Sequence, residues 1–96
     1  MFDGLYEVIS KDKEYVVIKL TNKKHPIFKA HFPRHPVLPG FLHFEIVADV
    51  FGIEITSIKK AKFMDLVVPN QTLTYIKKAS KFRVLRDDKE VASFSV

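Results

Sequence analysis

Apolar and polar residues alternate near the start of the chain in the way that marks strands. Residues 5–9 and 15–20 are rich in β-branched and aromatic side chains, and the polar stretch between them predicts a hairpin turn. In the second segment, Val16, Ile18 and Leu20 share one face, because side chains alternate between the two faces of a strand. We therefore expect an antiparallel pair of strands with one apolar face turned toward a core.

The second half of the chain shows the same alternation. Residues 72–76 and 81–85 are strand candidates joined by a polar stretch, and the two could instead form one long bent strand. Residues 53–57 also alternate, more briefly. A turn at residues 87–89 precedes a last strand, again with apolar residues at every second position.

The middle of the chain carries a different pattern. Residues 41–51 are apolar at most positions, and Gly52 closes the run. A helix that is apolar nearly all round is a buried one. At about 1.5 Å per residue, this helix would be roughly 16 Å long, which a curved sheet could wrap. One helix enclosed by five or six antiparallel strands predicts an α+β fold.

Length and composition set limits on the class of protein. The 96 residues predict a single domain, residues 1–96, with ordinary globular contents of 47% hydrophobic and 28% charged residues. Because so apolar a helix needs covering on every side, we expect at least a homodimer. The apolar runs are far shorter than the ~20 residues of a membrane span, so we expect no membrane insertion. The first residues lack a basic signal-peptide region and cysteine is absent, so a cytoplasmic location is the default.

The net charge of +5 favours an acidic partner. Nucleic acid, an acidic carrier protein and an anionic cofactor all fit that charge. The lysines are scattered along strand-like segments without a nucleic-acid recognition motif, which argues against nucleic acid. Lys81 and Arg83 point the same way on a predicted strand, and they form either a solvated face or a docking surface.

Three of the five prolines lie between His31 and Gly40. They fix the backbone at Pro33, Pro36 and Pro39, and they favour extended conformations for the residues before them. The segment is therefore a stiff arm, and a helix can begin only near Gly40.

Two protonatable side chains, His31 and Glu45, flank the junction of arm and helix. Such a pair is a candidate for acid-base catalysis. The first amides of a helix are unpaired donors at its positive end, so the Gly40 amide could stabilise a carbonyl oxygen that gains negative charge. Glu45 lies among apolar residues, where burial would favour its protonated form and make it a proton donor. The simpler alternative is a carboxylate that faces solvent or pairs with a lysine.

These residues resemble the active-site motif of the hot-dog-fold β-hydroxyacyl-(acyl carrier protein) dehydratases, of the FabZ and FabA type. The match runs from His31-Phe32-Pro33 through Pro36 and Pro39-Gly40 to an acid five residues after that glycine, without gaps. A second segment, residues 60–69, is similar to the family's strand after the helix. The resemblance implies a hot-dog fold, in which an antiparallel sheet of five to six strands wraps one central helix.

The resemblance also implies an activity and its residues. It implies dehydration of (3R)-hydroxyacyl-acyl carrier protein to the trans-2-enoyl thioester, with His31 as the base and Glu45 as the acid. The Gly40 amide, Phe32 and Arg34 would bind the substrate, and no cofactor or metal is needed. The partner would be acyl carrier protein with its phosphopantetheine-linked acyl chain, and each site would be built across a dimer.

Two positions depart from the family pattern. Arg34 stands where the motif has glycine, and its guanidinium could reach the phosphate of the carrier's arm. Asp49 shares the helix face of Glu45, where like charges repel, so we expect it to share a proton with Glu45 or to meet a basic partner.

Other interpretations stay open at this point. A metal site made from His31, His35, His43 and Glu45 is disfavoured because the prolines keep the first two off a common helix face, and we place the histidines other than His31 at the periphery. The fold also serves acyl thioesterases, which lack the proline arm. A non-catalytic subunit that binds an acyl chain or its carrier is a further alternative, suggested by Arg34 and Asp49.

Overall fold

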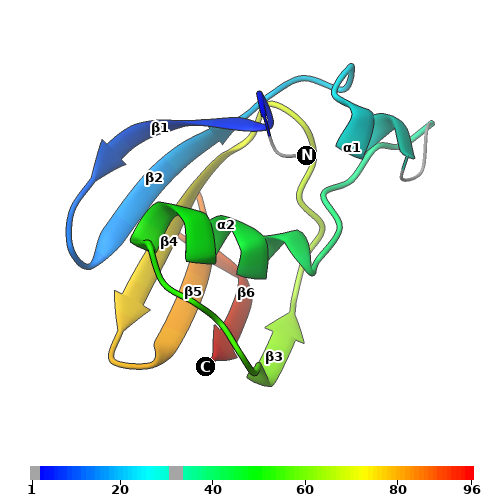
Figure 1. The fold of residues 1–96 in the computed structure, drawn as a ribbon. Helices are drawn as coiled ribbons and strands as arrows, with labels where there is room; N and C mark the ends of the chain where they lie inside the picture. Colours follow the sequence, from blue (N-terminus) through cyan, green and yellow to red (C-terminus); the bar gives the residue numbers. More distant parts are fainter. Residues whose placement is uncertain (1–2, 31–33) are drawn as a thin grey trace.

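The computed structural model describes residues 3–30 and 34–96, and Figure 1 shows their arrangement. Within these residues the elements follow one another as β1 (Tyr6–Lys11), β2 (Tyr15–Leu20), α1 (Pro26–Ala30), α2 (Leu42–Phe51), β3 (Lys59–Phe63), β4 (Thr72–Lys78), β5 (Lys81–Arg86) and β6 (Lys89–Ser95).

The strands form one antiparallel sheet in the order β1-β2-β4-β5-β6-β3. Helix α2 lies across one face of this sheet, and the short helix α1 lies beyond the sheet's end, with its Phe28 buried in the core (Figure 1). The expected α+β architecture, with a six-stranded sheet curved around one main helix, is confirmed.

The core lies between the inner face of the sheet and α2. Val16, Ile18 and Leu20 of β2 are all buried, as the alternation predicted. The buried side chains of the other central strands and of the helix complete one continuous cluster, which includes Leu42, Ile46, Val47, Val50, Leu73, Tyr75, Phe82, Val84, Val91, Ala92 and Phe94.

Helix α2 begins and ends close to the expected residues. Three successive short-range bonds tighten its entry, and in the first of them the amide of Leu42 donates to the Pro39 carbonyl at 3.0 Å. At the other end, Gly52 adopts a left-handed conformation with φ 63°, which glycine tolerates best, and its amide donates to Ala48.

The expectation that α2 is buried all round is wrong for the single chain. The sheet covers one side only, because a sheet packs against one face of a helix. Phe41, just before the helix, is 55% exposed, and Glu45 and Asp49 are exposed on the same uncovered side. Phe44, Ala48 and Phe51 are half-buried.

The two strands expected at residues 72–76 and 81–85 are confirmed, and the alternative of one long bent strand is wrong, because Ala79 turns the chain with a positive φ of 54°. Two other local features differ from the expectations. Residues 53–57 form no strand, since the chain there returns from α2 to the sheet edge, where β3 begins at Lys59. Helix α1 was not predicted, and its entry is capped by His25, whose Nδ1 accepts from the Ile27 amide at 3.1 Å.

Candidate functional site

The proline arm leads directly into α2 and is anchored along the way. Val37 and Leu38 are buried, and the amide of Leu38 donates to the Val67 carbonyl at 2.7 Å. Burial and this hydrogen bond therefore fix the arm at its C-terminal end. His31 and Phe32, the expected base and a substrate-binding residue, lie outside the described residues.

Gly40 stands where the arm becomes helix, and an aromatic ring packs directly against it. A Cβ built at Gly40 would lie 3.0 Å from Cε1 of Phe63, too close for any side chain without movement of the ring. Among the described residues, the Gly40 amide has no hydrogen-bond acceptor, so it stays available as a donor at the start of the helix.

Glu45 lies on the uncovered side of α2. It borders a hollow of about 480 Å³ between the helix and the segment that follows it. The lining is mostly apolar and consists of Phe44, Glu45, Ala48, Ile53, Glu54, Ile55 and Ile58. The Glu45 carboxylate is exposed in the single chain, so the expectation that it is buried is wrong for the single chain. The expected apolar neighbours do line the hollow beside it.

Asp49 has a partner that the sequence did not indicate. The hydroxyl of Tyr6, in β1, donates a hydrogen bond to Asp49 Oδ2. Partial burial, and then this carboxylate, raise the pKa of Tyr6, so the phenol stays protonated at neutral pH. Among the described residues Asp49 therefore pairs with a tyrosine, and no hydrogen bond joins its carboxylate to that of Glu45. The expectation of a basic partner for Asp49 stays a prediction.

His43 is buried in the core, and its assignment to the periphery is wrong. Its side chain is 3% exposed, and its Nδ1 lies 2.8 Å from the hydroxyl of Tyr75 in β4, at hydrogen-bond distance. Burial lowers the pKa of His43 to about 4, so the imidazole is neutral at pH 7. The signal was present in the sequence, because His43 stands three and four residues before the core residues Ile46 and Val47. Since Glu45 is exposed while His43 is buried, the two do not join in a metal site.

Arg34 borders a groove of about 730 Å³, which runs between the proline arm and the loop before β4. Lys23, Lys24 and His35 share its lining with Arg34, and Val37, Leu66, Val68 and Pro69 supply apolar surface. No carboxylate occurs among the described residues that line it. The groove therefore combines positive charge with an apolar floor.

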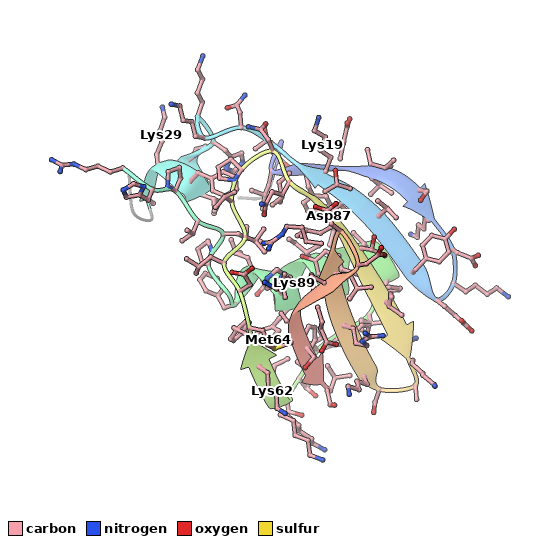
Figure 2. All side chains as sticks on the ribbon, turned by 180° about the vertical axis from the view of Figure 1, so that it is seen from behind. Lys19, Lys29, Lys62, Met64, Asp87 and Lys89 are labelled. Carbon is pink, nitrogen blue, oxygen red and sulfur yellow. The ribbon has the colours of Figure 1, made fainter. Side chains whose placement is uncertain are left out.

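Lys81 and Arg83 lie on the outer face of the sheet, pointing the same way as expected. Arg83 pairs with Glu90 of β6, with 2.7 Å between Nε and Oε1. In the register of the sheet, Lys78 of β4 is paired with Lys81. Ser93 of β6 is paired with Arg83 on one side and with Lys62 of β3 on the other, so Lys62 is in line with Arg83 across the sheet. Figure 2 shows this side of the molecule, with Lys62 extending from β3 into solvent.

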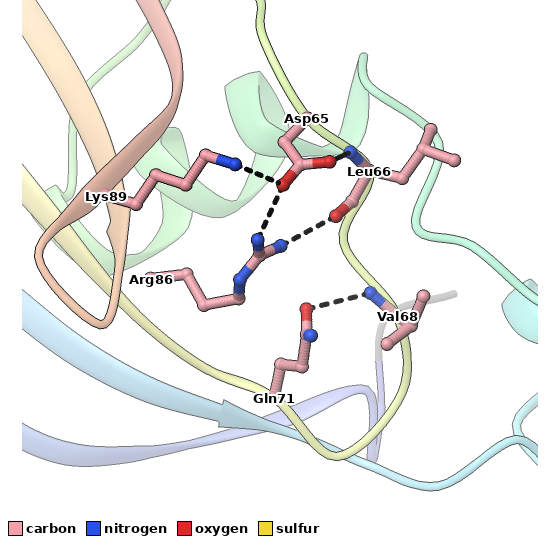
Figure 3. Close-up of polar contacts among 6 residues, drawn as sticks. All are labelled: Asp65, Leu66, Val68, Gln71, Arg86 and Lys89. Carbon is pink, nitrogen blue, oxygen red and sulfur yellow. Dashed lines mark hydrogen bonds and ion pairs between the residues drawn. The ribbon is translucent and has the colours of Figure 1, made fainter.

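Asp65 organises the loop that holds the arm. Its carboxylate accepts from Arg86 at 2.6 Å and from Lys89 at 3.2 Å, and Arg86 also donates to the Leu66 carbonyl (Figure 3). The hydrogen bond from Arg86, followed by that from Lys89, lowers the pKa of Asp65 to about 2. These contacts connect the loop to the turn between β5 and β6. They also hold in place the Val67 carbonyl, which accepts the hydrogen bond from the Leu38 amide.

The described residues hold no group of three or more side chains suited to bind a metal ion. Nor does any helix among them have the length and apolarity needed to cross a membrane.

Solved structures with this arrangement identify the class of fold. The chain superimposes with a TM-score of 0.69 on a chain of the dehydratase heterocomplex ApeI:P from Xenorhabdus doucetiae, covering 93% of both chains at 22% identity. A second neighbour is the PaaI protein of the phenylacetic acid degradation operon of E. coli, with a TM-score of 0.62 at 16% identity, over 97% of this chain and 82% of that one. The protein has a hot-dog fold.

Sequence comparison then gives the family. The ApeI-like family, described as ApeI dehydratase, matches residues 7–95. The chain is 34% identical to the 3-hydroxyacyl-(acyl-carrier-protein) dehydratase FabZ of Streptococcus mutans, over 86% of this chain and 67% of that protein. It is 33% identical to FabZ of Fusobacterium nucleatum, over 79% of this chain and 64% of that protein. The chain thus spans about two thirds of the length of these relatives. It belongs to the ApeI-like, FabZ-related dehydratase family.

Proposed function

We propose that this protein dehydrates (3R)-hydroxyacyl thioesters carried by acyl carrier protein. The observation that carries the proposal is the placement of two groups in a dehydratase-family chain, one just before α2 and one in its first turn. The Gly40 amide, which has no acceptor among the residues that the structure describes, lies just before the helix, and a carboxylate at Glu45 borders an apolar hollow little more than one turn further on. The hollow suits an acyl chain, because its walls are mostly Ile, Phe and Ala.

In the proposed reaction His31 removes a proton from C2 of the acyl chain. The thioester oxygen gains negative charge as the enolate forms, and the Gly40 amide donates a hydrogen bond to it. Glu45, in its acid form, gives its proton to the C3 hydroxyl, which leaves as water while the C2–C3 double bond forms. His31 is then protonated and Glu45 ionised, and the proton taken from C2 returns to the carboxylate for the next cycle. No cofactor enters this balance.

We further propose that the site is completed by a second copy of the chain. The uncovered side of α2 exposes Phe41 and leaves Phe44 half-buried beside Glu45. Covering this surface would shield the carboxylate from water and favour its protonated form, as the acid role requires. His31 of one protomer would then face Glu45 of its partner. A cytoplasmic location fits such an enzyme.

For Arg34 and Phe32 we propose substrate binding. The groove beside Arg34 offers a guanidinium and two lysines for the phosphate of the carrier's pantetheine arm, and an apolar floor for the rest of the arm. The groove runs along the proline arm, which ends at Gly40. An extended segment from Arg34 to Gly40 spans at most about 20 Å. The pantetheine group would therefore have to bridge a distance of about this size between a phosphate bound at Arg34 and the start of α2.

Lys81 and Arg83 are proposed to dock the acidic carrier. Reversing both charges with Lys81→Glu and Arg83→Glu should raise KM for a carrier-bound substrate, because steering by surface charge is lost. The KM for a small pantetheine thioester should hardly change. Steady-state kinetics at low and physiological salt measures this, since the effect weakens as salt screens it over ~8 Å.

The matched control carries the same change of charge on another surface. Lys11→Glu with Lys13→Glu alters the exposed β1–β2 hairpin and should leave both KM values unchanged. Equal losses on both substrates, or equal effects in both double variants, would contradict a docking surface at Lys81 and Arg83.

The function itself is tested by incubating the protein with a hydroxyacyl-carrier thioester and following the conjugated enoyl product. Release of free carrier thiol instead would identify a thioesterase. Binding of the carrier without turnover would identify the non-catalytic subunit.

A further inference from the structure

The buried pair His43 and Tyr75 has no part in the proposed chemistry. His43 is 3% exposed and Tyr75 is fully buried, with 2.8 Å between Nδ1 and the hydroxyl oxygen. A polar group placed in a core is costly unless it is hydrogen-bonded, and an apolar pair would pack there without that requirement. The pair is therefore a specific feature of this core that calls for a role.

Contacts lead from this pair to Gly40 in two ways. The backbone amide of His43 donates to the Gly40 carbonyl at 3.1 Å. The imidazole also stacks on the ring of Phe63, with 6.3 Å between centroids and 21° between planes. Phe63 is the ring that packs against Gly40. His43 thus touches Gly40 through the backbone and supports the ring that lies on it.

Tyr75 provides a rigid anchor for His43. Its strand, β4, is hydrogen-bonded on both sides, and Tyr75 is paired with Val16 of β2 and Val84 of β5. A hydrogen bond to this hydroxyl constrains the direction of the imidazole, in addition to the core packing that holds α2 against the sheet. Glu45 follows two residues later, about 200° around the helix, so any rotation of α2 would also turn its carboxylate.

We propose that His43 and Tyr75 are positioning residues that hold the entry of α2, and so orient the Gly40 amide and the Glu45 carboxylate toward the substrate. The inference rests on the proposed function and adds to it two residues that do not touch the substrate. A small displacement of reacting groups costs far more in turnover than in binding, so the effect belongs in kcat.

The test is Tyr75→Phe, which removes one oxygen and keeps the ring. It should lower kcat about 10-fold or more while KM changes less than about two-fold. The control is Val50→Ala, which removes buried apolar volume from the far end of the same helix. It should reduce thermal stability at least as much and leave kcat near the wild-type value.

The double variant Tyr75→Phe with His43→Leu separates positioning from stability. Replacing both polar partners with apolar groups should recover most of the melting temperature, because no buried polar atom is left unpaired. If the pair positions the site, kcat stays low. Recovery of kcat together with stability, or an equal loss of kcat in Val50→Ala, would overturn the proposal.

A second readout does not depend on activity. The chain has three glycines, Gly4, Gly40 and Gly52, so ¹⁵N-glycine labelling gives a spectrum of three amide signals. Tyr75→Phe should shift the Gly40 signal and leave that of Gly4 in place. An unchanged Gly40 signal would overturn the positioning role. If the wild type shows no dehydration, the proposed function fails, and the Gly40 signal still decides whether the pair orients that amide.

Discussion

Glu45→Gln and His31→Ala are each expected to lower dehydration by about 10²–10⁴-fold, the usual effect of losing a general acid or base. Glutamine keeps the size of Glu45 but cannot release a proton to the leaving hydroxyl. Alanine at position 31 removes the base that takes the C2 proton. The rate of enoyl formation under saturating substrate measures both losses.

Glu54→Gln is the matched control for Glu45→Gln, because Glu54 lines the same hollow and is exposed like Glu45. It should retain most of the wild-type rate. Both Glu variants should fold normally, since neither carboxylate is buried in the single chain. Wild-type turnover in Glu45→Gln, or an equal loss in Glu54→Gln, would refute the assignment of the acid.

Stability is expected to depend strongly on pH through His43. Its pKa is about 4 in the folded protein and 6.5 in a solvated histidine, because the core disfavours the charged imidazole. Between these values the unfolded chain binds a proton that the folded chain does not. The neutral His43 therefore contributes its full share to the free energy of unfolding above pH 6.5. This share is lost as the pH falls to 4, which lowers the free energy of unfolding by about 3 kcal/mol.

Urea denaturation at several pH values between 7.5 and 4 measures this loss, because that range runs from above the pKa of a solvated histidine down to the pKa of about 4 of His43 in the folded protein. His43→Phe should be less stable at neutral pH and should lose most of the dependence on pH. His35→Phe, at an exposed position, should keep it. A wild-type curve that stays flat between the two pKa values would contradict a neutral, buried His43.

The architecture was largely accessible from the sequence, because local pattern determines most of it. Alternation in β2 placed Val16 and Ile18 in the core, and the apolar run before Gly52 gave α2 and its end. The edge strand β3 was reached only through the family resemblance, since each of its residues is exposed and none alternates with buried neighbours.

The site was less accessible, because it depends on contacts between distant segments. No local pattern links Asp49 to Tyr6, which are 43 residues apart, or His43 to Tyr75. The exposure of Glu45 could not be predicted from composition either. A run of apolar residues shows that a helix is to be covered, and does not show whether its own sheet or a second chain covers it.

The central claim, a dehydration site that pairs His31 of one protomer with Glu45 of its partner, is tested most directly by mixing two inactive variants. His31→Ala and Glu45→Gln subunits, each nearly inactive alone, are allowed to exchange, and enoyl formation is measured before and after. A mixed dimer would contain one site with both groups lost and one site intact, so an equal mixture should recover about a quarter of wild-type activity. A mixture that stays as inactive as its parents after proven exchange would contradict the shared site.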